Sequence, residues 1–266
     1  MAIDLNAVKA KLQALQSKTT KQNNLWKPEP GTHQIRIVPY IHNPGNPFLE
    51  LYFHYNFVGK NILSPVTFGN ADPIVEFAEK LKSTGNKDDW KMGKSLEPKM
   101  RCYVPILVRG KESEGVKFWG FGKTVYQELL GFITDPDYGD ITDPMSGRDI
   151  TVEFKSKENT GKDYPETSIR VKPNTTVLSD KKDILALVKN QPKITELYKE
   201  YTYEEIEQLL EQWLNPETNT TQETASAEVE AETETAKKQP AKKIEAPTAT
   251  VPSDVAAAFD DLFKKK

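Results

Sequence analysis

The stretch that decides the fold is KMRCYVPILVRGKESEGVKFWGFGKTVY, residues 99–126. Successive side chains of a β-strand point to opposite faces, so a strand at the start of this stretch has one apolar face and one that mixes cations with a ring. The apolar face carries Cys102, Val104, Ile106 and Val108, and the other begins with Arg101 and Tyr103. A polar turn over 110–115 then predicts a second, antiparallel strand on which Lys117, Trp119 and Phe121 share a face.

Positive charge interleaved with large flat rings suits a polymer that has a phosphate at every step and a π-face on every base. Single-stranded nucleic acid is such a polymer. An ordinary antiparallel hairpin with a solvated outer face would show a similar pattern. At this point both interpretations stay open.

Composition divides the chain into a body and a tail. The 266 residues are 37% hydrophobic and 28% charged, with a mean hydropathy of -0.63, which indicates that a sizeable part lies outside a packed core. The net charge of -3 conceals an asymmetry, because residues 1–200 hold 29 Lys and Arg against 25 Asp and Glu, whereas residues 201–266 hold 7 against 14. An acidic tail therefore masks a mildly basic body, which is the part suited to phosphate binding.

The single cysteine, Cys102, lies on the apolar face of the first strand and is expected to be a small buried hydrophobe. No apolar signal-peptide core and no run of about 18 apolar residues occurs. We therefore expect a soluble protein of a reducing compartment that makes no membrane contact.

The N-terminal residues 1–22 carry Leu5, Val8, Leu12 and Leu15 at helical spacing, followed by lysines. This pattern predicts a short amphipathic helix that leads into a basic arm. Such a helix is marginally stable alone, so it gains order either from a partner surface or from its own domain.

Residues 23–180 read as short antiparallel strands interrupted by helices. Strands are expected over 34–37, 49–57, 61–67, 151–155 and 167–172, a helix from Pro73 capped by Asp72, a loop over 83–98, and a helix after Gly122. The loop 157–165 carries Lys162 and Tyr164, and Arg170 lies on an outer face. The pattern predicts a mainly β fold with peripheral helices around a five-stranded barrel of the OB type.

Beyond residue 180 the pattern becomes helical. Residues 181–215 are expected to form a helical extension that packs on the core, with a capping box at Thr202 and Glu205. Residues 216–266 form the acidic tail, whose Thr, Glu, Ala, Lys and Pro composition predicts disorder. Its end holds Phe259, Asp260, Asp261, Leu262 and Phe263, either a frayed terminus or a motif that docks on partner proteins.

Evidence for catalysis is sparse. The histidines His33, His42 and His54 and the lone cysteine form no ligand pairs at zinc spacing, and the nucleotide and nucleophile motifs are missing. Only the carboxylates of loop 135–143 leave a Mg²⁺-dependent nuclease open. We therefore expect a protein that is not an enzyme.

Taken in order, several segments resemble the single-stranded DNA-binding, helix-destabilising proteins of large tailed phages. These segments are Leu25-Trp26-Lys27, the strand Ile35 to Pro39, Tyr103 to Val108, Phe118 to Lys123 with Tyr126, and the hairpin Phe154 to Tyr164. The resemblance covers about residues 23–180, and the block Phe-Trp-Gly-Phe-Gly-Lys is its most specific part.

The resemblance implies an OB-fold core whose cleft holds DNA with aromatic and basic side chains. It assigns that role to Lys99, Arg101, Tyr103, Phe118, Trp119, Lys123, Tyr126 and Tyr164, to which the loop and outer-strand cations Lys162 and Arg170 are added. It further implies self-association along DNA through an N-terminal motif, here Lys18, Thr19, Thr20 and Lys21, and contacts of the tail with phage replication and recombination proteins.

Many relatives hold zinc with one His and three Cys. Here Asp72-Pro73-Ile74-Val75 stands where a Cys-x-x-Cys is expected, so we predict no zinc and no other cofactor, with apolar packing by Phe68, Ile74 and Phe77 instead. The expected function is sequence-independent coating of single-stranded DNA in phage replication, recombination and repair, in the cytoplasm of the infected bacterium. An RNA-binding OB protein, the nuclease above and a recruitment scaffold without nucleic-acid affinity stay open as alternatives.

Overall fold

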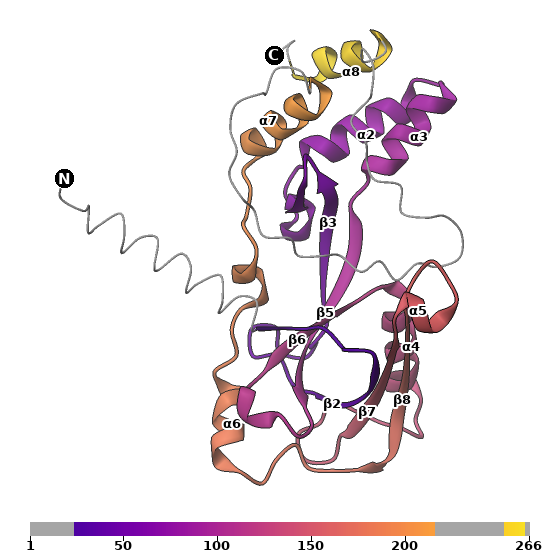
Figure 1. The fold of residues 1–266 in the computed structure, drawn as a ribbon. Coiled ribbons are helices and arrows are strands. Elements are labelled where there is room, and N and C mark those ends of the chain that lie inside the picture. Colours follow the sequence, from indigo (N-terminus) through magenta and orange to yellow (C-terminus); the bar gives the residue numbers. More distant parts are fainter. Residues whose placement is uncertain (1–23, 216–252, 264–266) are drawn as a thin grey trace, which may run out of the picture. The chain divides into compact units, whose positions relative to one another are not determined.

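The structure is a computed structural model that describes residues 24–215 and 253–263, which fall into two compact units (Figure 1). Unit 1 contains 24–49 and 102–197, and unit 2 contains 50–101, 198–215 and 253–263. The predicted single core 23–180 is thus shared between two units, and so is the predicted helical extension 181–215. The arm 1–22 and the tail residues 216–252 lie outside the described residues.

A mixed sheet of eight strands forms the framework. Its strands are β1 (Leu25–Trp26), β2 (Gly31–Ile37), β3 (Leu49–Phe57), β4 (Lys60–Leu63), β5 (Lys99–Val108), β6 (Lys117–Phe121), β7 (Arg148–Lys155) and β8 (Glu166–Thr175). The order is β1-β6-β5-β2-β7-β8, with β3 paired to β4 and β5. Strands β1 and β6 are parallel, whereas β2–β5, β2–β7, β5–β6 and β7–β8 are antiparallel. This order is that of an open sheet, which begins at β1 and ends at β8. The closed five-stranded barrel therefore stays a prediction.

In unit 1 the two predicted hairpins are present. The β5–β6 turn contains the 3₁₀ helix η2 (Glu112–Glu114) and two glycines in the left-handed region, Gly110 at φ +86° and Gly115 at φ +83°. Helix α4 (Lys123–Thr134) begins after Gly122 as predicted and lies against β8, and the short helix α5 (Lys157–Thr160) occupies the predicted β7–β8 loop. Ile184 and Val188 of helix α6 (Lys182–Lys189) pack on Val38 and Leu107.

In unit 2, helices α2 (Pro73–Ser83), α3 (Lys87–Leu96), α7 (Tyr203–Leu214) and α8 (Ser253–Phe263) share one apolar core (Figure 1). Both predicted caps are confirmed: Asp72 accepts from the backbone N–H of Ile74 at 2.9 Å, and Thr202 and Glu205 form a capping box. The prediction of a tail that is disordered as far as residue 266 differs from the structure at 253–263, where α8 forms because its apolar residues recur at helical spacing and bury against this core.

The predicted loop over 83–98 is wrong, because Asn86 caps helix α3 there. Gly93 makes the packing of α3 on α2 possible: a Cβ at this position would lie 2.5 Å from the backbone oxygen of Ala78. A helix that contains glycine has weak intrinsic propensity, so close packing rather than local sequence determines α3.

Strand β4 is shorter than predicted, because the chain turns at Pro65 into the 3₁₀ helix η1 (Pro65–Phe68). Phe68 is 40% exposed, so its predicted role in apolar packing is wrong, whereas Ile74 and Phe77 are fully buried as predicted. A third 3₁₀ helix, η3 (Ile194–Leu197), lies at the end of the described part of unit 1.

A buried polar cluster joins three segments of unit 2. Nε2 of His54 lies 3.0 Å from Oδ2 of Asp72, Nδ1 of His54 lies 2.9 Å from the carbonyl oxygen of Leu96, and the Ser64 hydroxyl donates to Asp72. Burial is the largest single influence on the pKa of Asp72 and raises it. The hydrogen bonds and charge of His54, together with the donors Ser64 and Ile74, outweigh that influence and hold the pKa below its usual value.

We expect Asp72→Ala to lower the free energy of unfolding by about 2–4 kcal/mol, because it removes both a helix cap and the acceptor of two buried donors. Urea denaturation measures this loss. Asp88→Ala, in which an exposed ion pair with Lys91 is lost, is the control and should cost much less, because exposed ion pairs contribute little to stability.

The same cluster predicts a pH dependence. A carboxylate whose pKa is depressed by folding stabilises the protein above its unfolded pKa of about 4, and that stability is lost as the pH falls through the folded pKa. The advantage of the wild-type chain over Asp72→Asn should therefore shrink as the pH falls from about 5 towards 2. An advantage that stayed constant over this range would contradict the prediction, because it would show that folding does not depress the pKa of Asp72.

Candidate nucleic-acid interface

The rings predicted to contact DNA on β5 and β6 lie inside unit 1. Phe118 and Trp119 are 0% and 1% exposed, and Tyr103 is 7% exposed. Aromatic neighbours cover them: Tyr40 meets Phe118 edge-on at 5.8 Å between ring centroids, and Phe121 lies 4.6 Å from Trp119. The prediction of an open ring-bearing face is therefore wrong, because both faces of the hairpin are packed. Cys102 is fully buried, which confirms its prediction as core.

In this conformation no base can stack on Phe118 or Trp119. The assignment of these two residues to DNA binding stays a prediction. It now requires that the core open, which is costly for side chains of this size.

The other predicted residues are dispersed. Lys99 and Arg101 belong to unit 2, and the remainder lie in unit 1. On α4, Lys123 is exposed, while the ring of Tyr126 lies 5.4 Å from that of Phe48.

At the β7–β8 loop the ammonium of Lys162 lies 5.6 Å from the ring centroid of Tyr164 and also pairs with Glu166. Arg170 is exposed on β8. The structure thus brings Lys162 and Tyr164 together; Lys18, Thr19, Thr20 and Lys21 lie outside the described residues.

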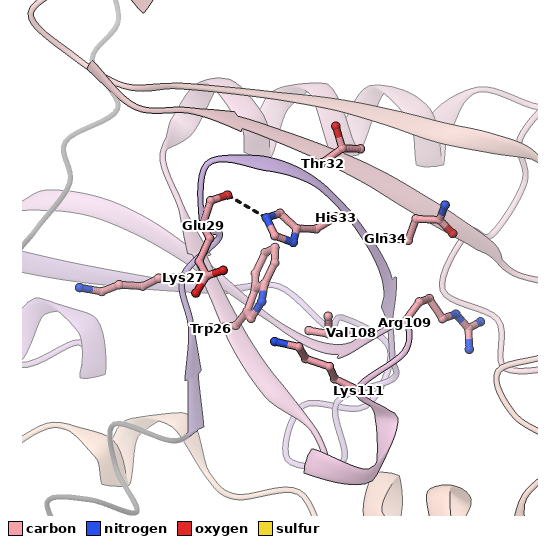
Figure 2. Close-up of a pocket in the computed structure, with 9 residues that line it drawn as sticks. All are labelled: Trp26, Lys27, Glu29, Thr32, His33, Gln34, Val108, Arg109 and Lys111. Atoms are coloured by element: carbon pink, nitrogen blue, oxygen red, sulfur yellow. Dashed lines mark hydrogen bonds between the residues drawn. The ribbon is translucent and has the colours of Figure 1, made fainter. Parts of the chain in front are cut away.

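Unit 1 contains a pocket of about 350 Å³ that combines a half-buried tryptophan with cations (Figure 2). Its lining comes from the start of unit 1, from strand β2 and from the end of β5 with the turn that follows. The lining residues are Trp26, Lys27, Glu29, Thr32, His33, Gln34, Val108, Arg109 and Lys111.

The indole of Trp26 is fixed by the strands beneath it. Trp26 pairs with Trp119 in the parallel β1–β6 register, and the two rings meet edge-on at 5.8 Å. A second edge contact joins Trp26 to the His33 ring at 5.6 Å, and His33 donates from Nε2 to the carbonyl oxygen of Glu29 at 2.7 Å (Figure 2). Trp26 is therefore held in place before any ligand arrives, which lowers the entropic cost of stacking on it.

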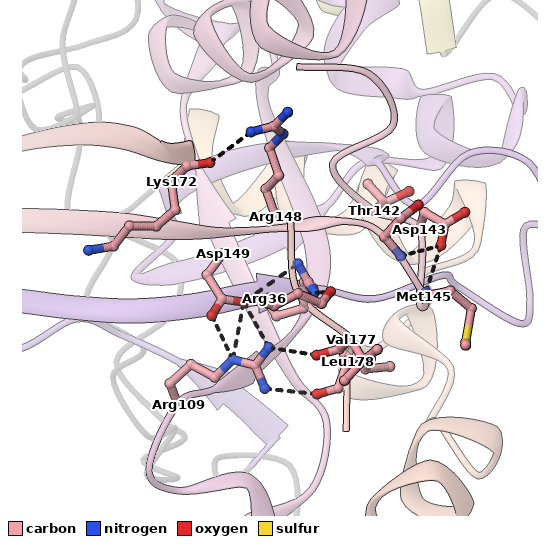
Figure 3. Close-up of polar contacts among 12 residues, drawn as sticks. Arg36, Arg109, Thr142, Asp143, Met145, Arg148, Asp149, Lys172, Val177 and Leu178 are labelled. Carbon is pink, nitrogen blue, oxygen red and sulfur yellow. Dashed lines mark hydrogen bonds and ion pairs between the residues drawn. The ribbon is translucent and has the colours of Figure 1, made fainter. Parts of the chain in front are cut away.

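Two kinds of cation line the pocket. Lys27 and Lys111 are exposed and carry long, adaptable side chains. Arg109 is rigid, because Nε and Nη2 donate to the Asp149 carboxylate at 2.8–3.1 Å and Nη1 donates to the carbonyl oxygen of Leu178 at 2.8 Å (Figure 3).

Behind Arg109 lies a second guanidinium, that of Arg36, which is fully buried. Its Nη1 is 3.6 Å from the same Asp149 carboxylate (Figure 3). Its Nη2 donates to the hydroxyl of Thr176 at 3.0 Å. Burial is the main cause that lowers the pKa of Arg36 below its usual value, although Asp149 opposes it.

Asp149 lies between the two guanidinium groups, Glu112 also pairs with Arg109 at 3.8 Å, and the charge of Asp143 also acts on Arg36. These groups therefore leave no excess of positive charge here. The exposed cations of the pocket lining are Lys27 and Lys111, and their charge favours an anionic ligand.

This arrangement suits binding rather than catalysis. An aromatic face with flexible cations beside it can stack a base and contact the adjoining phosphates. A volume of about 350 Å³ is at the lower end of the range of roughly 300–1,000 Å³ that small-ligand pockets occupy.

The carboxylates of loop 135–143 serve a structural purpose. Asp140 accepts from the backbone N–H of Thr142, and Asp143 accepts from those of Met145 and Ser146. No group of three potential metal ligands occurs in residues 24–215 and 253–263. The loop therefore gives no support to a Mg²⁺ nuclease.

The zinc site of relatives does not fit the residues present here. His54 already faces an acceptor oxygen at each ring nitrogen, and Asp72 is occupied by His54 and Ser64. The absence of zinc stays a prediction.

The features above are those of a nucleic-acid-binding protein. A family model described as gp32 DNA binding protein like matches residues 29–215, and the chain belongs to this family. DNA is therefore its partner, and the resemblance to the single-stranded DNA-binding proteins of phages is confirmed. No curated protein matches the chain. In the part of the chain that the structure describes, no helix is long and apolar enough to cross a membrane.

Sequence reasoning named Trp26 and Lys27 only as part of the resemblance and missed His33 and Lys111. The signal at 26–27 was an aromatic next to a cation at the start of the folded body. It also missed Trp90, which is 50% exposed on helix α3. Isolated exposed apolar residues are common, so Trp90 alone defines no site.

Trp119→Ala should lower the free energy of unfolding by about 3–5 kcal/mol, because it deletes a large core side chain. Urea denaturation measures the loss, and Trp90→Ala is the matched control, expected within about 0.5 kcal/mol of the wild type. A loss below about 1 kcal/mol for Trp119→Ala would contradict its placement in the core.

Proposed function

We propose that this protein binds single-stranded DNA without sequence preference and coats exposed strands during phage DNA replication, recombination and repair, in the cytoplasm of the infected bacterium. The observation that carries the proposal is the Trp26 pocket, a fixed indole flanked by exposed lysines, in a member of a DNA-binding family. The OB-type barrel predicted from the sequence belongs to this proposal.

Binding would combine two physical terms. Lys27 and Lys111 would contact backbone phosphates and release counterions, so affinity falls as salt rises. The Trp26 indole would stack on a base, which contributes roughly 1–3 kcal/mol and tolerates any base because every base has a π-face. A base inside a duplex is already stacked on both sides, so the pocket favours single strands and lowers the apparent stability of duplexes by mass action.

Three further parts of the proposal concern the rest of the chain. The basic arm with Lys18, Thr19, Thr20 and Lys21 would mediate self-association along DNA, and the tail would contact replication and recombination proteins. The protein would not be an enzyme and would need no zinc. Metal analysis of the purified protein checks the last point, and about one bound zinc per chain would contradict it.

The double variant Lys27→Gln/Lys111→Gln tests the pocket. Each phosphate contact on a single strand contributes about 0.7 to the slope of log affinity against log salt, so we expect the slope to fall by about 1.4. Titrations with labelled oligo(dT) at several salt concentrations measure it. Lys189→Gln, on helix α6 and outside the pocket lining, is the control and should leave the slope unchanged. A double variant with the wild-type slope would contradict the assignment.

The same titrations separate the alternatives. Tighter binding of oligo(U) than of oligo(dT) would indicate an RNA-binding protein. Cleavage of the oligonucleotide in Mg²⁺ would indicate a nuclease, and no binding even at low salt would indicate a recruitment scaffold.

A further inference from the structure

Helix α8 is an acidic amphipathic helix seated on the apolar face of α2 and α7 (Figure 1). Val255, Ala258 and Phe259 are buried there, the last with 5% of its surface exposed. The ring of Phe259 meets Phe77 of α2 edge-on at 6.2 Å, and Phe263 lies 6.5 Å from Tyr203 of α7.

Charge complements the apolar contact. The carboxylate of Asp261 lies 2.6 Å from the ammonium of Lys80, near the end of α2, where a helix favours cations. Helix α8 contains three aspartates and no cation. The helix therefore buries Val255, Ala258 and Phe259, and Asp261 pairs with a cation of the surface on which the helix packs.

Helix α8 depends on this surface for its order. It has 11 residues, and isolated helices shorter than about 12–15 residues are marginal in water. The 37 residues of segment 216–252 that join it to α7 contain no aromatic residue and few large apolar ones. The side chains of α8 itself therefore make the contact with α2 and α7, as the side chains of a helical peptide do when it binds in a groove.

We propose that the face of α2 and α7 is a docking site for an acidic amphipathic helix, and that the chain's own α8 occupies it and withholds its apolar side chains from partner proteins. Occupation is intramolecular, because a segment of 37 residues can span on the order of 100 Å and the tether gives α8 a local concentration in the millimolar range. A partner that recognises Phe259 must compete with Phe77 for it. The terminal motif is thereby available only in the fraction of molecules in which α8 is released.

Thiol labelling of the full-length chain measures that fraction. Cys102 is fully buried, so in Ala258→Cys the new thiol is the one expected to react with a disulfide reagent. We expect it to react at least about tenfold more slowly than the same cysteine in a free peptide of residues 252–266. An equal rate would overturn the proposal, because α8 would then not be docked.

Two further arms test the site. Adding Phe259→Ala should abolish most of the protection. Lys80→Glu should raise the labelling rate about two- to five-fold, because it replaces an ion pair with Asp261 by a repulsion. Combining Lys80→Glu with Asp261→Lys should restore the original labelling rate. The control Lys91→Glu on α3 should leave the labelling rate unchanged. Thermal melts followed by circular dichroism confirm that each variant is folded.

Competition requires no destabilising variant. Cysteine-free peptide 252–266, added at concentrations above the millimolar local concentration of the tethered helix, should raise the labelling rate of the Ala258→Cys chain, because it occupies the α2–α7 face. No effect of the peptide would show that α8 is a permanent part of unit 2 and would overturn the proposal. Protection that increases with protein concentration would show exchange of α8 between two copies and would overturn intramolecular occupation.

Discussion

The contact on which the site depends is the edge-on packing of Trp26 against Trp119. Trp119 is buried between paired strands and meets Phe121 on β6, so it cannot move without loss of core packing. Trp26 is held in place by this ring through the parallel register of β1 and β6, and it remains partly exposed. The molecule thus places one ring in the core, where it contributes stability, and a second at the surface, where it can meet a base.

The cations around Trp26 follow the same division. Arg36 and Arg109 share the carboxylate of Asp149 and are held in place by it, and Glu112 also pairs with Arg109, so these charges serve mainly to fix the end of the sheet. Lys27 and Lys111 are exposed and adaptable, which suits a phosphate chain whose geometry varies from step to step. A pocket with one fixed ring and two exposed ammonium groups suits the sequence-independent binding proposed above.

Local sequence was sufficient for the features that local forces determine. Alternation predicted β5 and β6 with their turn, Asp72 predicted the start of α2, and the pair Thr202 and Glu205 predicted the start of α7. Helix α3 was missed because its packing depends on the absence of a side chain at Gly93, opposite the backbone of α2.

The site depends on contacts between distant segments and could not be predicted in the same way. Alternation shows which side chains share a face of a strand but not what packs on that face, so Tyr103 and Trp119 were placed outside and are inside. Arg36 can be buried because its guanidinium forms an ion pair with Asp149 on another strand. The Trp26 pocket unites residues of 26–34 with 108–111, which are brought together by the order of strands in the sheet. The apolar spacing of residues 253–263 can be seen in the sequence, but the surface of α2 and α7 on which helix α8 packs cannot.

The central claim is that DNA meets Trp26 at the surface and not the rings inside the β5–β6 hairpin. Photocross-linking to an oligonucleotide of 5-iododeoxyuridine, followed by mass spectrometry of the peptides, tests it directly, since this base forms adducts with aromatic rings that stack on it. The account predicts adducts on Trp26 and none on Phe118 or Trp119. Adducts on Trp119 with Trp26 unmodified would contradict it and would show that the core opens to admit the strand.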